Sequence, residues 1–129
     1  MYRQAMIAGA IFAALAVILG AFGAHALKEV LTESQLQTFE TGVRYQVYHA
    51  FALLITGIAY THLQVKQLKL ASLFFIIGII LFSGSLYLLT MMKMTGQVGL
   101  GGLGILTPIG GLFFILGWIM LCLGFIQKK

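Results

Sequence analysis

The stretch LASLFFIIGIILFSGSLYLLTMM, residues 70–92, contains no charged side chain from end to end. At ~1.5 Å of rise per residue, a helix of this length crosses the ~30 Å hydrocarbon core of a bilayer. A strand of a membrane barrel would be about ten residues long and would alternate apolar with polar side chains, and this run does neither. The stretch therefore predicts a transmembrane helix.

The composition of the whole chain agrees with this prediction. Of its 129 residues, 60% are hydrophobic and only 9% are charged, and the mean hydropathy is +1.03, which is outside the range of soluble domains. Three further apolar runs, at about 5–24, 43–60 and 103–126, are long enough to cross a membrane. We predict an all-α integral membrane protein with one membrane domain, residues 1–129, in which four transmembrane helices form a compact left-handed bundle.

Small residues recur at helical spacing along the first and last of these runs. In membranes, small side chains let two helix backbones approach closely. We therefore predict that the helices pack through Gly9, Gly20 and Gly23 in the first run and Gly110, Gly117 and Gly124 in the last.

The distribution of Lys and Arg predicts the orientation, because short positively charged loops stay in the cytoplasm. The side with both termini carries five such residues: Arg3, Lys66, Lys69, Lys128 and Lys129. The other side carries three: Lys28, Arg44 and Lys93. Both termini are thus predicted to be cytoplasmic. The net charge of +5 suits anionic lipid headgroups, and the sequence gives no reason to expect nucleic acid as a partner.

The polar segment between the first two spans is patterned like a helix. Thr32 and Gln35 have the spacing of a capping box, and Leu36, Phe39 and Val43 then recur every three or four residues. We predict a short amphipathic helix, about residues 32–42, on the outer membrane surface and running on, with a bend at Gly42, into the second span. A partly ordered polar loop is the alternative.

Polar side chains inside predicted spans form the candidate site. Such residues are costly in lipid unless they face protein or trapped water, so they mark functional sites by default. We expect one ligand-binding cluster near the outer leaflet, roofed by the amphipathic helix, with His25 and His49 as neighbours; its members are His25, Tyr45, Gln46, His49, Ser83 and Tyr87. The alternative is a purely structural network of hydrogen bonds between helices.

The sequence gives little support for catalysis, a metal or a cofactor. There is no Asp, all three Glu lie in the external segment, and the histidines have no short metal-ligand spacing. Residues 99–104 match the pattern G-x-G-x-x-G but follow no strand, so we interpret them as a glycine-rich external turn. Pro108 is then expected near the first turn of the last helix, where it costs no hydrogen bond. We expect no catalytic residues, no metal and no cofactor.

Four motifs in order resemble one protein family. They are GAFGAH (20–25), FETGVRYQVYH (39–49), FSGSLYL (82–88) and TPIGGL (107–112) followed by Gly117 and Trp118. Together they resemble the YwdK/YgdD family of small membrane proteins over essentially the whole chain. The resemblance implies a four-helix protein of the bacterial cytoplasmic (inner) membrane, and it implies no particular activity.

Two classes of function stay open. The first is a small transport or permeation unit, expected to be a homo-oligomer because a tightly packed four-helix bundle leaves little lumen, with a small solute or lipid at the polar cluster. The second is an accessory, assembly or structural protein that binds lipid or another membrane protein. A water-filled or ligand-occupied cavity at His49 would favour the first, and a dry, fully hydrogen-bonded His49 with a large exposed groove of small residues would favour the second.

Overall fold

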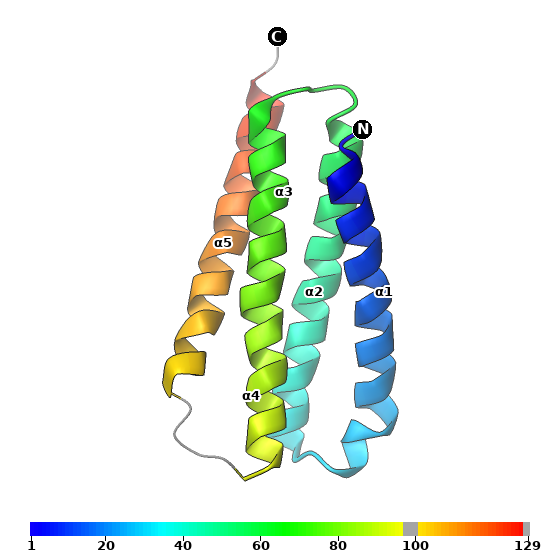
Figure 1. Ribbon diagram of the computed structural model, residues 1–129, viewed down its shortest axis with the longest axis vertical. Coiled ribbons are helices and arrows are strands. Elements are labelled where there is room, and N and C mark those ends of the chain that lie inside the picture. The colour runs from blue at the N-terminus through cyan, green and yellow to red at the C-terminus, as the bar shows by residue number, and fades with distance from the viewer. Residues whose placement is uncertain (97–100, 128–129) are drawn as a thin grey trace.

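A computed structural model describes residues 1–96 and 101–127, and the described part is helical and contains no β-strand. The helices are α1 (Arg3–His25), α2 (Glu33–Ala59), α3 (Lys66–Gly78), α4 (Gly84–Met94) and α5 (Gly101–Ile126). A short 3-10 helix, Leu27–Glu29, follows α1, and a π-helical segment, Ile79–Ser83, joins α3 to α4 into one column. Figure 1 shows the start of α1 and the end of α5 at the same end of the molecule.

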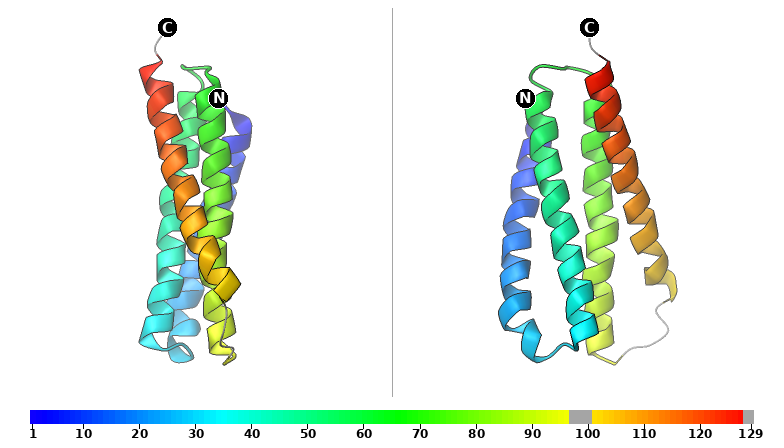
Figure 2. Two further views of the ribbon diagram at one scale, coloured as in Figure 1. Left: turned by 90° about the vertical axis from the view of Figure 1, so that its left-hand side faces the viewer. Right: turned by 180° about the vertical axis from the view of Figure 1, so that it is seen from behind.

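The helical columns lie side by side in the order α1, α2, α3–α4, α5. Helix α1 packs on α2, and both α2 and α5 pack on the α3–α4 column. Figures 1 and 2 show this row from the front and from behind, and its edge-on view is narrower. The expected bundle is therefore a flattened one, in which α1 and α5 are the outer members.

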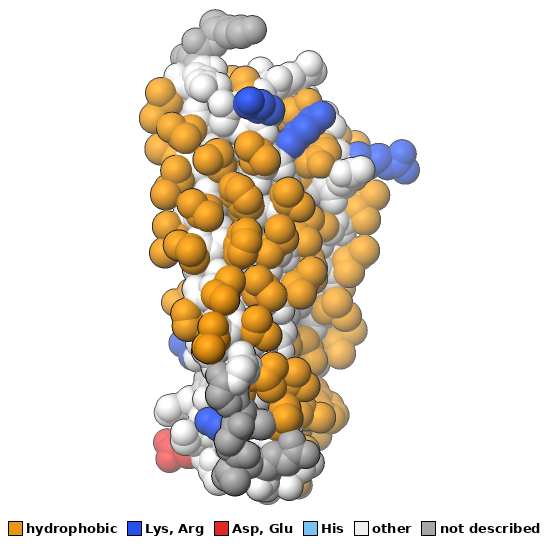
Figure 3. All heavy atoms as spheres, turned by 60° about the vertical axis from the view of Figure 1, so that its left-hand side comes forward, with side chains coloured by type: hydrophobic (Ala, Val, Ile, Leu, Met, Phe, Trp, Pro, Cys, Tyr) orange, Lys and Arg blue, Asp and Glu red, His pale blue; other side chains and the backbone are white. Residues whose placement is uncertain are grey.

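Within residues 1–96 and 101–127, three helical stretches are long and apolar enough to cross a membrane: Arg3–Glu29, Lys66–Met94 and Gly102–Ile126. Helix α2 is not among them, and it carries Glu33, Glu40 and Arg44 in its first half. On the face shown in Figure 3, apolar side chains cover the middle, while Lys, Arg and acidic side chains lie toward the two ends. This distribution is the one expected for a protein that sits in a bilayer.

The seam between α5 and the α3–α4 column is built from glycines opposite large side chains. Gly110, Gly117 and Gly124 recur every seven residues, as do Phe82, Phe75 and Leu68 on the other helix. A Cβ at Gly117 would lie 2.6 Å from the Phe75 ring, and one at Gly124 would lie 2.8 Å from Leu68. At Gly110 it would meet the backbone of Phe82. The three predicted glycines of α5 therefore lie at close helix contacts.

In the seam between α1 and α2, two of the three predicted glycines lie at close contacts. A Cβ at Gly9 would lie 2.9 Å from the carbonyl oxygen of Ala50, and one at Gly23 would lie 2.9 Å from the Phe39 ring. At Gly20 the nearest atom is 3.5 Å away on Val43, an ordinary van der Waals distance. Gly20 is therefore not needed for close approach, in contrast to the prediction.

The capping box is confirmed, but it starts α2 itself and not a separate amphipathic helix. Thr32 Oγ1 accepts a bond from the Gln35 amide at 3.2 Å, and the Gln35 side chain accepts one from the Thr32 amide at 3.1 Å. Helix α2 then runs without interruption from Glu33 to Ala59. The helix continues through Gly42, where a Cβ would lie 2.7 Å from the ring of Tyr87.

The last helix begins earlier than predicted. Residues 101–104 already belong to α5, so the glycine-rich segment is not a turn over these positions, and residues 99 and 100 lie outside the described part. Pro108 is consequently inside the helix and not in its first turn. A proline at such a position removes the hydrogen bond to the carbonyl four residues earlier, that of Gly104.

Candidate functional site

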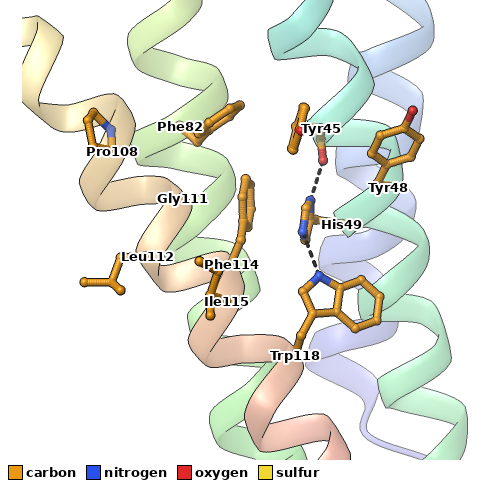
Figure 4. Close-up of a pocket in the computed structure, with 10 residues that line it drawn as sticks. All are labelled: Tyr45, Tyr48, His49, Phe82, Pro108, Gly111, Leu112, Phe114, Ile115 and Trp118. Carbon is orange, nitrogen blue, oxygen red and sulfur yellow. Dashed lines mark hydrogen bonds between the residues drawn. The ribbon is translucent and has the colours of Figure 1, made fainter.

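His49 is buried on α2, with 4% of its surface exposed. Its Nδ1 lies 2.7 Å from the backbone oxygen of Tyr45, and its Nε2 lies 3.0 Å from the indole nitrogen of Trp118 on α5 (Figure 4). An indole N–H can only donate and a carbonyl can only accept. The imidazole is therefore neutral, carries its proton on Nδ1, and accepts a hydrogen bond from Trp118.

Aromatic rings pack around this pair. The Phe114 ring stacks on His49 with a centroid distance of 3.5 Å and an interplanar angle of 7°, and the Phe75 ring lies at 5.7 Å. Phe114 and Trp118 are one turn apart on α5, as Tyr45 and His49 are on α2, so each pair shares one helix face. Two turn-spaced pairs therefore meet between α2 and α5.

A groove of about 690 Å³ lies beside these rings, between α2 and α5 (Figure 4). Its lining is aromatic and aliphatic and contains no Lys, Arg, Asp or Glu; it consists of Tyr45, Tyr48, His49, Phe82, Pro108, Gly111, Leu112, Phe114, Ile115 and Trp118. Such a wall suits an apolar molecule and offers a charged one no counter-ion.

The groove lies near the middle of the apolar helices. Phe82 is close to the centre of the stretch 70–92, and Phe114 is close to the centre of the run 103–126. By helical rise, His49 lies ~24 Å from the first residue of α2 and ~15 Å from its last residue. The groove is therefore not at the outer end of the helices, where the sequence predicted the site, and the first turns of α2 do not cover it.

Gln46 is the centre of a second polar cluster, on another side of α2. Its Nε2 donates to the backbone oxygen of Phe12 on α1 at 2.8 Å, and its Oε1 accepts from the Tyr87 hydroxyl at 2.7 Å. Ser83 donates to the backbone oxygen of Gly42 at 2.7 Å. These bonds join α1, α2 and the α3–α4 column. Among the described residues, every buried polar side-chain atom has a partner.

A further hydrogen bond joins α4 to α5. The Ser85 hydroxyl donates to the backbone oxygen of Phe82 at 2.9 Å, and the Thr107 hydroxyl lies 2.6 Å from the Ser85 oxygen. Because Ser85 has already used its single proton, Thr107 is the donor of the second bond. Side-chain bonds thus connect each helix of the row to a neighbour.

The six predicted site residues do not form one cluster. Tyr45 and His49 lie at the groove, whereas Gln46, Ser83 and Tyr87 belong to the second cluster. His25 is exposed at the end of α1. Gly9 on α1 contacts Ala50, the residue that follows His49 on α2, so Gly9 and His49 lie at about the same height along the helices. His25 lies sixteen residues beyond Gly9 on α1, which is ~24 Å by helical rise. The structure therefore does not bring His25 to His49.

The sequence-based prediction missed the residues of α5 that complete the groove, above all Trp118 and Phe114. A usable signal was present, because the one Trp of the chain lies inside an apolar run and its N–H needs an acceptor there. His49 is the histidine deepest inside a predicted span and is the natural acceptor.

No three His, Cys, Asp or Glu side chains in residues 1–96 and 101–127 lie close enough together to hold a metal ion. The one cysteine, Cys122, is exposed on α5 and unpaired within this described part.

Comparisons with known proteins identify similar sequences. The pattern of a family described as "Protein of unknown function (DUF423)" matches residues 19–111. The UPF0382 membrane protein YwdK of Bacillus subtilis is 43% identical over 117 residues, which cover 90% of each chain. The UPF0382 inner membrane protein YgdD of Escherichia coli is 34% identical over 127 residues, or 98% of this chain and 92% of that one. No solved structure matches.

Proposed function

The chain belongs to the DUF423 family of membrane proteins, and we propose that it works there as an accessory protein that binds apolar molecules of the bilayer in the groove between α2 and α5. The observation that carries this proposal is the groove itself: it is wide, uncharged, aromatic, and placed at the middle of apolar helices. The activity of the family gives no further guidance, because its members are described only as membrane proteins.

The proposal includes α2 as a fourth transmembrane helix. Helix α2 lies between α1 and the α3–α4 column over its length (Figure 1), so a bilayer that surrounds those helices also surrounds α2. Its acidic side chains, Glu33 and Glu40, are confined to its first turns. Arg3 and Lys66 begin α1 and α3 at the opposite end, which we place in the cytoplasm with both termini.

A transport unit is the less supported of the two functional classes. A path for a polar solute needs polar atoms that are free to replace its water. Among the described residues, the buried side-chain polar atoms are already bonded to each other or to the backbone. His49 in particular has both nitrogens engaged beside an exposed groove. This arrangement favours binding from the side over passage through the helices.

The test fills the groove and asks whether a bound molecule is lost. Gly111 lines the groove, and a Cβ there would lie 3.8 Å from Phe82, so Gly111→Leu adds bulk without a backbone clash. Gly104→Leu is the matched control, because Gly104 is on the same helix and a Cβ there has no neighbour within 4 Å. Native mass spectrometry of the protein released from membranes should detect an apolar small molecule on the wild type and on Gly104→Leu.

We expect the Gly111→Leu variant to retain much less of this molecule while its helical content and thermal stability stay those of the control. Equal retention by all three proteins, or no bound molecule on the wild type after mild extraction, would end the proposal.

A further inference from the structure

We propose that the groove selects an uncharged lipophile whose head carries a hydrogen-bond acceptor of the carbonyl type, and that the phenol groups of Tyr45 and Tyr48 bind this head. The inference rests on the proposed function and names the chemical class of its ligand. It is carried by three features: the chemistry of the groove wall, two free donors, and the depth at which they lie.

The wall excludes a charged head. None of the residues that line the groove is Lys, Arg, Asp or Glu. His49, the one titratable base in the wall, has its Nδ1 bonded to Tyr45 O and its Nε2 bonded to Trp118. A phosphate or an ammonium group would lose its hydration there and gain no counter-ion. An uncharged head avoids this cost.

The two phenol groups supply hydrogen-bond donors. Tyr45 is 40% exposed and Tyr48 is 53% exposed, both line the groove, and their rings lie edge to face with centroids 5.7 Å apart. Within the described residues, neither hydroxyl makes a hydrogen bond, in contrast to the Tyr87 hydroxyl, which donates to Gln46. An exposed phenol surrounded by hydrocarbon lacks water as a partner, so an acceptor on a ligand satisfies it.

The depth distinguishes between classes of lipid. Tyr45 packs on Phe82, with ring centroids 4.7 Å apart, and Phe82 is near the centre of the apolar stretch 70–92. A phospholipid keeps its charged headgroup at the membrane surface and reaches this depth only with its acyl chains, which have no acceptor there. An uncharged lipophile dissolves in the bilayer interior, so its weakly polar head can meet the two phenols.

The remaining wall fits a hydrocarbon tail. Along α5, the lining runs from Pro108 through Leu112 and Ile115 to Trp118, a length of ~15 Å by helical rise. Trp118 is the one Trp of the chain, so its fluorescence reports on whatever occupies this wall.

The experiment compares two brominated probes that quench Trp fluorescence, 10-bromodecan-2-one and 1-bromodecane, in nanodiscs at matched mole fractions in the bilayer. The two differ in the carbonyl group. One to two hydrogen bonds in a membrane correspond to a ~3- to 10-fold gain in affinity. We expect the ketone to reach half-maximal quenching of Trp118 at a mole fraction lower by this factor.

The double variant Tyr45→Phe/Tyr48→Phe keeps both rings and removes both donors, so we expect the ketone and the alkane to quench it equally. Tyr60→Phe, at the end of α2 and away from the groove lining, is the control and should behave as the wild type.

Equal quenching of the wild type by both probes would overturn the inference and leave the proposed function intact, provided that Gly111→Leu weakens both. Stronger quenching by a phospholipid brominated on its acyl chains would assign the groove to phospholipid and also overturn the inference. A third outcome is that no probe quenches Trp118 until the protein is diluted in the bilayer. This result would show that a second copy of the chain fills the groove. If Gly111→Leu changes none of these curves, the proposed function fails as well.

Discussion

Gly110 is the position at which one added methyl group should do most damage to the helix row. A Cβ there would lie 2.8 Å from Cα of Phe82 and would also contact its backbone nitrogen. Backbone atoms of a packed helix cannot rotate away as a side-chain tip can. The contact with the backbone nitrogen is the closer of the two, and to bring it to 3.4 Å α5 must move away from the π-helical segment by ~1 Å.

The cost follows from this movement. Overpacking a close contact costs ~1–3 kcal/mol, and the shift also weakens the Ser85–Thr107 and His49–Trp118 hydrogen bonds, each worth ~0.6 kcal/mol in a membrane. We expect Gly110→Ala to lower the free energy of unfolding by ~2–4 kcal/mol. Gly111→Ala, whose Cβ would lie 3.8 Å from Phe82, should stay within ~0.5 kcal/mol of the wild type.

The assay is reversible unfolding in bicelles by added dodecyl sulfate, followed by circular dichroism, with both variants measured in the same bicelles. The difference between the neighbouring positions is the decisive quantity, because both substitutions raise helix propensity by the same amount. A Gly110→Ala protein as stable as Gly111→Ala would refute the close approach of α5 to the π-helical segment.

Three further predictions use other contacts. Trp118→Phe should cost ~1 kcal/mol in the same unfolding assay, since it leaves His49 Nε2 without its donor. A double-mutant cycle with His49→Leu, which removes the acceptor, would contradict this bond if it found no coupling. Gly23→Ala should lower thermal stability in detergent by ~1–2 kcal/mol whereas Gly20→Ala should change it by less than ~0.5 kcal/mol, and the reverse order would show that the α1–α2 seam is misplaced. Cysteines introduced at Glu33 and Lys66 in a Cys122→Ser protein should react with an impermeant thiol reagent on intact cells at Glu33 alone, and equal labelling would refute the cytoplasmic placement of the termini.

The glycine seams were predictable because their spacing is visible in the sequence, but their partners were not. Gly110, Gly117 and Gly124 could pack against any of the large apolar residues in the chain, and the seven-residue match with Leu68, Phe75 and Phe82 is one of many registers. Gly20 shares the spacing of Gly23, yet it faces a small gap beside Val43. Spacing identifies the face of a helix, whereas the tightness of each contact depends on the side chain opposite.

The candidate site was predictable in its residue types and not in its grouping. Tyr45 and His49 are one turn apart and share a face, but Gln46 is rotated by ~100° from Tyr45 about the helix axis. That rotation directs Gln46 to α1 and α4, and His49 to α5. The sequence shows that α2 has polar residues on adjoining faces, and only the order of the helices in space decides which neighbour each face meets.

The most direct test of a groove that opens to lipid at mid-depth is the quenching of Trp118 by phospholipids brominated at known positions of the acyl chain, with the unmodified protein in nanodiscs. Trp118 is 43% exposed and lies along a groove centred near Phe82 and Phe114. We predict strong quenching by bromines in the distal half of the chain and weaker quenching by bromines near the ester. Strongest quenching by the bromines near the ester, or an emission that no brominated lipid reduces, would contradict the placement of the groove and, with it, a role in binding molecules of the bilayer interior.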